Sequence, residues 1–109
     1  MEQQMEPKVI NIGRDFSRYP AGRYISDGPY SGEAFREQFL LPSLRKTNEI
    51  IVVEFEGARG YGSSFLEEAF GGLVRAGFDK EALFGRMELR SGDTSLIEEI
   101  RTYITDQSK

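Results

Sequence analysis

The residues best suited to chemistry lie in residues 57–64, which read G-A-R-G-Y-G-S-S and follow an apolar run. A glycine-rich loop between a strand and a helix allows backbone amides to surround a phosphate group. A nucleotide-hydrolysing loop of this type requires a lysine directly after its last glycine, where this chain has Ser63. The dinucleotide-binding pattern is also incomplete, because Phe65 stands in place of its third glycine. We therefore interpret the glycines as a tight turn, with nucleotide binding as the alternative.

A helix is predicted from residue 63 to about residue 76, where Gly77 is suited to end it. Ser63 or Ser64 would cap its first turn. At 100° per residue, an arc of about 140° carries the charged and glycine positions, and the remainder of the helix is apolar. This polar arc consists of Glu67, Glu68, Gly71, Gly72 and Arg75. The apolar remainder predicts burial in the core.

The adjacent glycines Gly71 and Gly72 require an explanation, since a glycine inside a helix costs roughly 1 kcal/mol relative to alanine. Close packing within the domain is one explanation, and a flat surface for a partner is the other. Packing within the domain would desolvate the charges of the same arc, which favours a partner. We predict that the polar arc, with Arg59 and Tyr61 of the preceding loop, forms a docking face.

Two other groups of residues are candidate sites. Five carboxylates could hold a divalent cation or perform acid-base chemistry, but their spacing is not diagnostic, so we predict no catalytic or metal-binding residue. They are Glu54, Glu56, Glu67, Glu68 and Asp93. Residues 14–24 mix arginines with aromatic residues and predict a solvated hairpin. A contact patch for an acidic partner, formed by Arg14, Arg18 and Arg23, is the alternative.

The elements that position these residues follow from local patterns. Strands are expected at residues 9–12, 21–26, 50–55 and 86–90, and helices at residues 32–41, 63–76 and from residue 95 onward. The run at residues 50–55 is almost wholly apolar and predicts a central strand. Ser95 and Glu98 fit a capping box for the last helix. The alternation predicts a small α/β domain, with a mixed sheet of about four strands and three helices.

Length and composition limit the possible functions. The 109 residues suit a single domain, with residues 1–7 and 106–109 expected to be flexible tails. The formal charge of −4 disfavours nucleic-acid binding, and the lack of cysteine and histidine excludes disulfides, zinc–thiolate sites and histidine-dependent catalysis. No secretory signal or membrane-length apolar run is present, so we expect a cytoplasmic protein without a membrane or cofactor partner.

The stretch S-S-F-L-E-E-A-F, preceded by I-I-V-V-E-F-E-G, resembles the STAS-like domain family DUF4325. Phe65, Glu67 and Glu68 match the start of one helix in that family. The start of the preceding helix is matched by Ser31, Glu33 and Ala34. The resemblance implies a STAS-like fold for the chain.

STAS domains include anti-sigma factor antagonists, whose serine at the start of the helix after the central strand is phosphorylated by a GHKL-type kinase. The resemblance therefore makes Ser63 and Ser64 candidate phosphorylation sites and a GHKL-type ATPase or kinase a candidate partner. We expect a non-enzymatic, bacterial regulatory module that binds another protein. The alternatives are a small nucleotide-binding or hydrolytic domain using residues 57–64, and an acidic inhibitor from a mobile element. Neither the sequence nor the resemblance indicates an oligomeric state.

Overall fold

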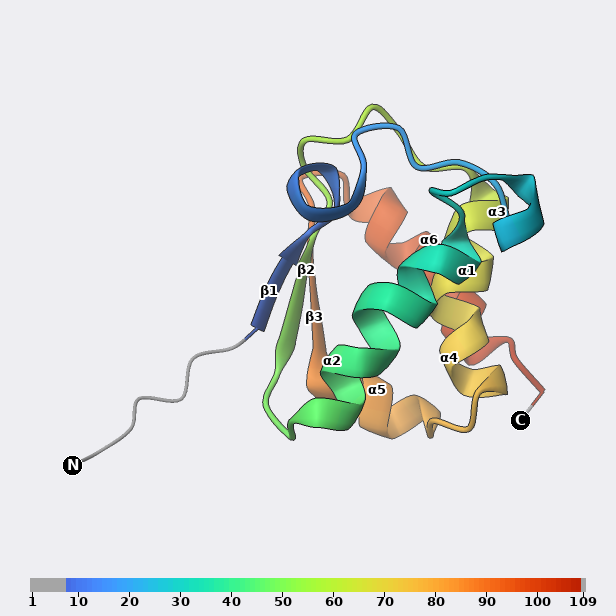
Figure 1. Ribbon diagram of the computed structural model, residues 1–109. Helices are drawn as coiled ribbons and strands as arrows, with labels where there is room; N and C mark the ends of the chain where they lie inside the picture. The colour runs from blue at the N-terminus through green and yellow to red at the C-terminus, as the bar shows by residue number, and fades with distance from the viewer. Residues whose placement is uncertain (1–7, 109) are drawn as a thin grey trace.

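The computed structural model describes residues 8–108, which form an α/β domain of two layers. Its strands are β1 (Lys8–Asn11), β2 (Ile51–Glu54) and β3 (Met87–Arg90). Within the described residues, the sheet has the order β1-β2-β3 and all its pairs are parallel. Neighbouring parallel strands in chain order require right-handed crossovers on one side, so the helices lie together over one face of the sheet (Figure 1).

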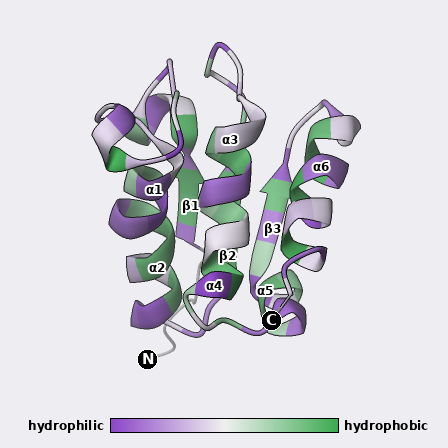
Figure 2. Cartoon of the chain, turned by 90° about the vertical axis from the view of Figure 1, so that its right-hand side faces the viewer, coloured by the Kyte–Doolittle hydropathy of each residue, from purple (hydrophilic) through white to green (hydrophobic). Residues whose placement is uncertain are grey.

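The helices pack their apolar sides toward the sheet (Figure 2). They are α1 (Gly32–Phe35), α2 (Leu41–Lys46), α3 (Ser63–Leu66), α4 (Gly72–Arg75), α5 (Lys80–Arg86) and α6 (Thr94–Thr105). A π-helical segment, Arg36–Leu40, joins α1 to α2, and another, Glu67–Gly71, joins α3 to α4. Each pair therefore forms one continuous helix, α1–α2 and α3–α4.

The core fills the space between the two layers. Ile51 and Val53 of β2 are fully buried, and Val52 on the opposite side is 1% exposed. Three buried phenylalanines from the helices cover this strand: Phe35, Phe65 and Phe70. The prediction of a central strand from the apolar run is therefore confirmed.

The strand predicted at residues 21–26 is absent from the described structure, where this segment is a loop ending in a 3-10 turn, Ile25–Asp27. Asp27 explains the difference, because its carboxylate accepts the backbone N–H groups of Arg23 and Tyr24. These local bonds replace those of a strand pair. The prediction of a mixed sheet of about four strands is wrong for residues 8–108, which form three parallel strands.

The helices also differ from the prediction of three. The first helix continues past Pro42 to Lys46, because the π-helical segment before it already shifts the bonding pattern: the Leu41 N–H donates to the Arg36 carbonyl, five residues back. Helix α5 was not predicted, although the Asp79 carboxylate caps it by accepting the Ala82 N–H at 3.1 Å.

Two helix ends were also predicted from local signals. The helix expected from residue 63 is confirmed as α3–α4, and Gly77 follows it with φ +113°. Asp93 caps α6 in place of the predicted Ser95. The tail expected at residues 1–7 lies outside the described residues. Among the helices of residues 8–108, none combines the length and apolar character needed to cross a membrane.

Candidate functional site

The polar arc of α3–α4 is closed by arginines from elsewhere in the domain. Glu68 pairs with Arg36 of the α1–α2 helix at 2.8 Å, and the same guanidinium donates to the Glu68 carbonyl at 2.6 Å. Glu67 pairs with Arg75 at 2.8 Å, and Arg23 bridges Glu67 and Glu68 from the loop before α1. Arg36 and Glu68 are 9% and 7% exposed. The arc is thus an ion-pair network whose charges are matched within the domain, buried around Glu68 and exposed at Arg75.

Gly71 and Gly72 are buried beneath this network. A Cβ atom on Gly72 would lie 3.0 Å from Cζ of Arg36 and nearer still to Nη1. A Cβ atom on Gly71 would lie 2.7 Å from Nε2 of Gln107. The glycines therefore allow close packing within the domain, and the prediction that they offer a flat surface to a partner is wrong.

Gln107 also corrects the tail predicted at residues 106–109. Its side chain donates to Glu67 at 2.8 Å and accepts from Arg75 at 2.8 Å. Its backbone carbonyl accepts from the Lys80 ammonium group. Gln107 is therefore held against the folded domain, and residue 109 lies outside the described part.

Glu67 remains charged at neutral pH. Burial raises the pKa of Glu67, but hydrogen bonds from Arg75, Arg23 and Gln107 outweigh burial and lower the pKa to about 2. The same contact with Glu67 raises the pKa of Arg23 and of Arg75. Two carboxylates face three guanidinium groups, so the predicted acidic docking face is electrostatically compensated.

The first turn of α3 is exposed, in contrast to the rest of the helix. Its N-cap is Gly62, so Ser63 and Ser64 lie within the helix and neither side chain caps it. The Ser63 hydroxyl lies near the Tyr103 phenol. The Ser64 hydroxyl makes no hydrogen bond to any residue from 8 to 108. The capping explanation therefore fails, and Ser64 is exposed at the positive end of a 13-residue helix.

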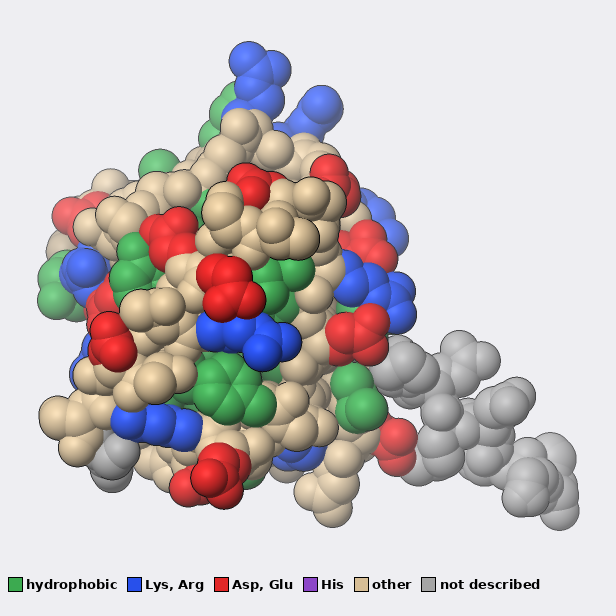
Figure 3. Space-filling model, turned by 180° about the vertical axis from the view of Figure 1, so that it is seen from behind, with side chains coloured by type: hydrophobic (Ala, Val, Ile, Leu, Met, Phe, Trp, Pro, Cys, Tyr) green, Lys and Arg blue, Asp and Glu red, His purple; other side chains and the backbone are tan. Residues whose placement is uncertain are grey.

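Two loops frame this turn. Arg59 donates its N–H to the Arg18 carbonyl at 2.8 Å, which holds the loops together, and its exposed guanidinium lies 5.9 Å from the Tyr19 ring. Figure 3 shows basic side chains projecting from this end of the molecule. Tyr61 is half-buried: its hydroxyl donates to the Phe55 carbonyl at 2.7 Å, and burial raises its pKa. Tyr61 thus anchors its loop more than it presents a surface.

Several large apolar side chains of the loop before α1 are exposed: Tyr19 at 64%, Ile25 at 53%, Tyr24 at 51% and Tyr30 at 47%. Arg23 ties this loop to α3–α4. We define the tip surface as Arg18, Tyr19, Tyr24, Ile25, Tyr30, Arg59, Ser63 and Ser64. Tyrosine and arginine are the residue types enriched where protein interfaces gain their affinity.

A shallow hollow of about 350 Å³ lies beside the tip surface, at the carboxyl ends of β1 and β2. Ligands of parallel α/β sheets commonly bind at this end. Two of the three charged side chains that line it are engaged: Arg14 pairs with Asp15 at 2.8 Å, and Glu56 accepts the Gly92 N–H at 3.0 Å, while Arg18 is the third. The Glu56 carboxylate would also repel a phosphate.

The other sequence candidates do not converge on a site. Arg14 and Arg18 line the same hollow, but Arg23 belongs to the network, so the three arginines do not form one patch. Within residues 8–108, no group of three or more acidic side chains could hold a metal ion.

Sequence reasoning missed Arg36 and Gln107, the residues that cover the polar arc. The signal for them was the Gly71–Gly72 pair, because two helical glycines indicate that another group approaches closely. That signal did not say which group approaches, since Arg36 is 32 residues from Glu68 along the chain.

Comparison with protein families finds a match to one described as a STAS-like domain of unknown function (DUF4325), over residues 31–95. The matched segment contains β2, β3 and all of α3–α4. Neither a curated protein nor a solved structure matches the chain.

Proposed function

The chain belongs to the STAS-like family DUF4325, and we propose that it is a non-enzymatic regulatory module that binds a protein partner through its tip surface. The observation that carries the proposal is the contrast in exposure along α3–α4. The polar arc has its charges matched internally, whereas the first turn, with Arg59 and Tyr19 beside it, is open. Exposed tyrosine and arginine side chains suit protein recognition.

Ser64 is the proposed switch within this surface. A phosphate there would add roughly two negative charges at a helix N-terminus, which stabilises them. Arg59 lies in the adjoining loop and supplies a cation for the phosphate. The modification would change the charge of the tip surface without disturbing the buried network. Ser63 is the second candidate, and its nearness to Tyr103 makes it the less accessible of the two.

The proposed partner is a GHKL-type ATPase or kinase, by analogy with anti-sigma factor antagonists. A protein partner is favoured over a nucleotide because the hollow beside the loop is shallow and holds the Glu56 carboxylate. An inhibitor that mimics nucleic acid by its negative charge is less well supported, since the exposed end carries Arg18 and Arg59.

The test is calorimetric titration of the chain with GHKL-type ATPases and kinases. We expect the unmodified chain and Ser64→Ala to bind with similar affinity, and Ser64→Asp to bind at least tenfold more weakly. Tyr19→Ala should weaken binding comparably, because Tyr19 lies in the contact. Equal affinities of the Ser64→Asp and unmodified chains would reject the switch, and unaltered binding by Tyr19→Ala would reject the surface. Saturable binding of adenine nucleotide to the chain alone would favour the alternative function.

A further inference from the structure

Strand β3 leaves one edge of the sheet unpaired. The Phe55 N–H donates to the Arg90 carbonyl at 3.1 Å, so Arg90 and, two residues earlier, Glu88 direct their backbone groups toward β2. The backbone N–H and carbonyl of Leu89 and the carbonyl of Met87 consequently face away from β2. The Met87 N–H donates to the Leu83 carbonyl. No strand of residues 8–108 pairs with this edge. It presents an acceptor at Met87 and both a donor and an acceptor at Leu89.

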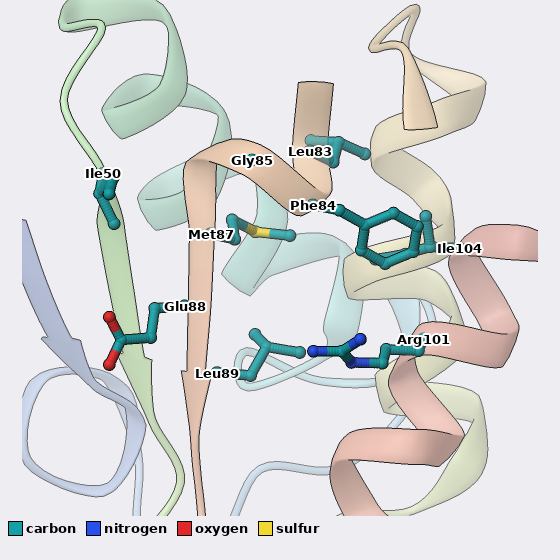
Figure 4. Close-up of a pocket in the computed structure, with 9 residues that line it drawn as sticks. All are labelled: Ile50, Leu83, Phe84, Gly85, Met87, Glu88, Leu89, Arg101 and Ile104. Atoms are coloured by element: carbon teal, nitrogen blue, oxygen red, sulfur yellow. The ribbon is translucent and has the colours of Figure 1, made fainter. Parts of the chain in front are cut away.

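A hollow of about 270 Å³ lies along the same edge, between β3, the end of α5 and α6 (Figure 4). Its walls combine polar and apolar surface, and the apolar part is formed by Leu83, Phe84, Met87, Leu89 and Ile104. Phe84 is 41% exposed, and the Arg101 guanidinium lies 6.0 Å from its ring. No carboxylate among residues 8–108 forms an ion pair with Arg101. The hollow thus joins an apolar site to an uncompensated cation.

We propose that an extended segment of a partner protein adds to the edge of β3 as a further strand, with an apolar side chain in the hollow and a carboxylate against Arg101. Strand addition satisfies the exposed backbone groups, and side-chain pockets then provide specificity. Side chains two residues apart point to the same side of a strand. Met87 lies near Phe84, and Leu89 lies near Arg101 (Figure 4). The added segment therefore needs an apolar residue opposite Met87 and, two positions away, an acidic residue opposite Leu89.

A second copy of this chain fits the edge less well than an acidic segment. The other edge strand, β1, would bring Lys8 to the helix side of the sheet, because Lys8 shares that side with buried Ile10. If β3 of a second copy paired with this edge, its Met87 and Leu89 would lie on the helix side, and neither supplies a carboxylate for Arg101. On the opposite side of β3, Glu88 and Arg90 already pair at 2.6 Å and need no partner charge.

This inference is independent of the proposed function, because the hollow lies toward the start of β3 and the tip surface at the carboxyl ends of β1 and β2. The test uses the full chain and two fluorescein-labelled peptides, Ser-Val-Leu-Thr-Glu-Val-Ser and Ser-Val-Glu-Thr-Leu-Val-Ser, for the two strand directions. Fluorescence anisotropy should give one of them a Kd on the order of 100 μM. Replacing its glutamate with lysine should weaken binding at least tenfold. Failure of both peptides to bind at about 1 mM would overturn the proposal.

Backbone pairing is tested by two N-methylated versions of the binding peptide, methylated at odd or at even positions. A strand that pairs along one edge donates from alternate residues, so one version should bind as before and the other should not. Binding of both versions would overturn strand addition. This measurement leaves the protein unaltered and does not depend on the folding of any variant.

The cation is tested by Arg101→Glu, with Arg45→Glu as the matched control, since Arg45 is exposed on α2, away from the hollow. We expect Arg101→Glu to bind the glutamate peptide more weakly and the lysine peptide more tightly than the unmodified chain does. Arg45→Glu should leave both affinities unchanged. Equal effects of the two variants would overturn the role of Arg101. Sedimentation of the unmodified chain provides a further test. If the chain is a dimer and Arg101→Glu is a monomer, the edge binds a second copy, and the proposal is overturned.

Discussion

Two regions of the same helix differ in how their polar residues are used. In the first turn of α3, Ser63 and Ser64 face solvent. One to two turns later, Glu68 and Gly72 are buried beneath Arg36. Both regions are polar in sequence, but only the second was predicted to form a docking face, whereas the serines were predicted as helix caps or phosphorylation sites. The difference teaches that polar residues on a helix indicate a partner surface only where no cation from the same chain reaches them.

The largest effect on stability is expected from a substitution in the buried region of the helix. Arg36→Ala leaves the Glu68 carboxylate buried without its closest partner, so the free energy of unfolding should fall by about 3–5 kcal/mol. Arg59→Ala, on the tip surface, should change it by no more than about 0.5 kcal/mol. Urea denaturation of both variants measures the contrast. Similar losses in the two would contradict the distinction.

A smaller effect is expected from Gly72→Ala, because the added Cβ would displace the Arg36 guanidinium. Overpacking of this kind destabilises by about 1–3 kcal/mol, despite the better helix propensity of alanine. Gly60→Ala is the control, since nothing lies within 4 Å of its Cβ position. Thermal unfolding should separate the two variants. A stabilised Gly72→Ala would show that the helix, not the contact, dominates at this position.

The pH dependence of stability tests the charges of the network. Because the folded-state pKa of Glu67 is lowered to about 2 from its usual 4.5, its stabilising effect is complete above pH 4.5 and is lost as the pH falls toward 2. The loss in the free energy of unfolding should be on the order of 1–2 kcal/mol. Glu67→Gln should reduce this acid-induced loss, whereas the same change at exposed Glu81 should not. Equal acid sensitivity of all three proteins would contradict the network's role.

The smallest effect is expected at the open end of the helix. Ser64→Asp places a negative charge in the first turn of α3 and should stabilise the fold by about 0.3–1 kcal/mol. The same change at Ser108, outside a helix, should have no such effect. Thermal unfolding at low salt measures the difference. Destabilisation by Ser64→Asp would indicate that the serine is packed and not free.

Local patterns in the sequence determined the central strand β2, the helix α3–α4, its end at Gly77 and the α/β class. These features depend on neighbouring residues: an unbroken apolar run, a helical period and a glycine at a left-handed position. The family was also identifiable, because its motif lies within the segment that contains β2 and α3. The position of Ser63 and Ser64 at the helix start follows from the same local order, although their predicted capping role does not hold.

Tertiary structure alone decided which polar residues remain available to a partner. Arg23, Arg36 and Gln107 reach Glu67 and Glu68 across 32 to 45 residues of chain, and no local period encodes such contacts. The loop at residues 21–26 was likewise decided by the Asp27 carboxylate, which competed with strand pairing. Burying a carboxylate is favourable only beside a matching cation, and the position of that cation depends on how the whole chain folds.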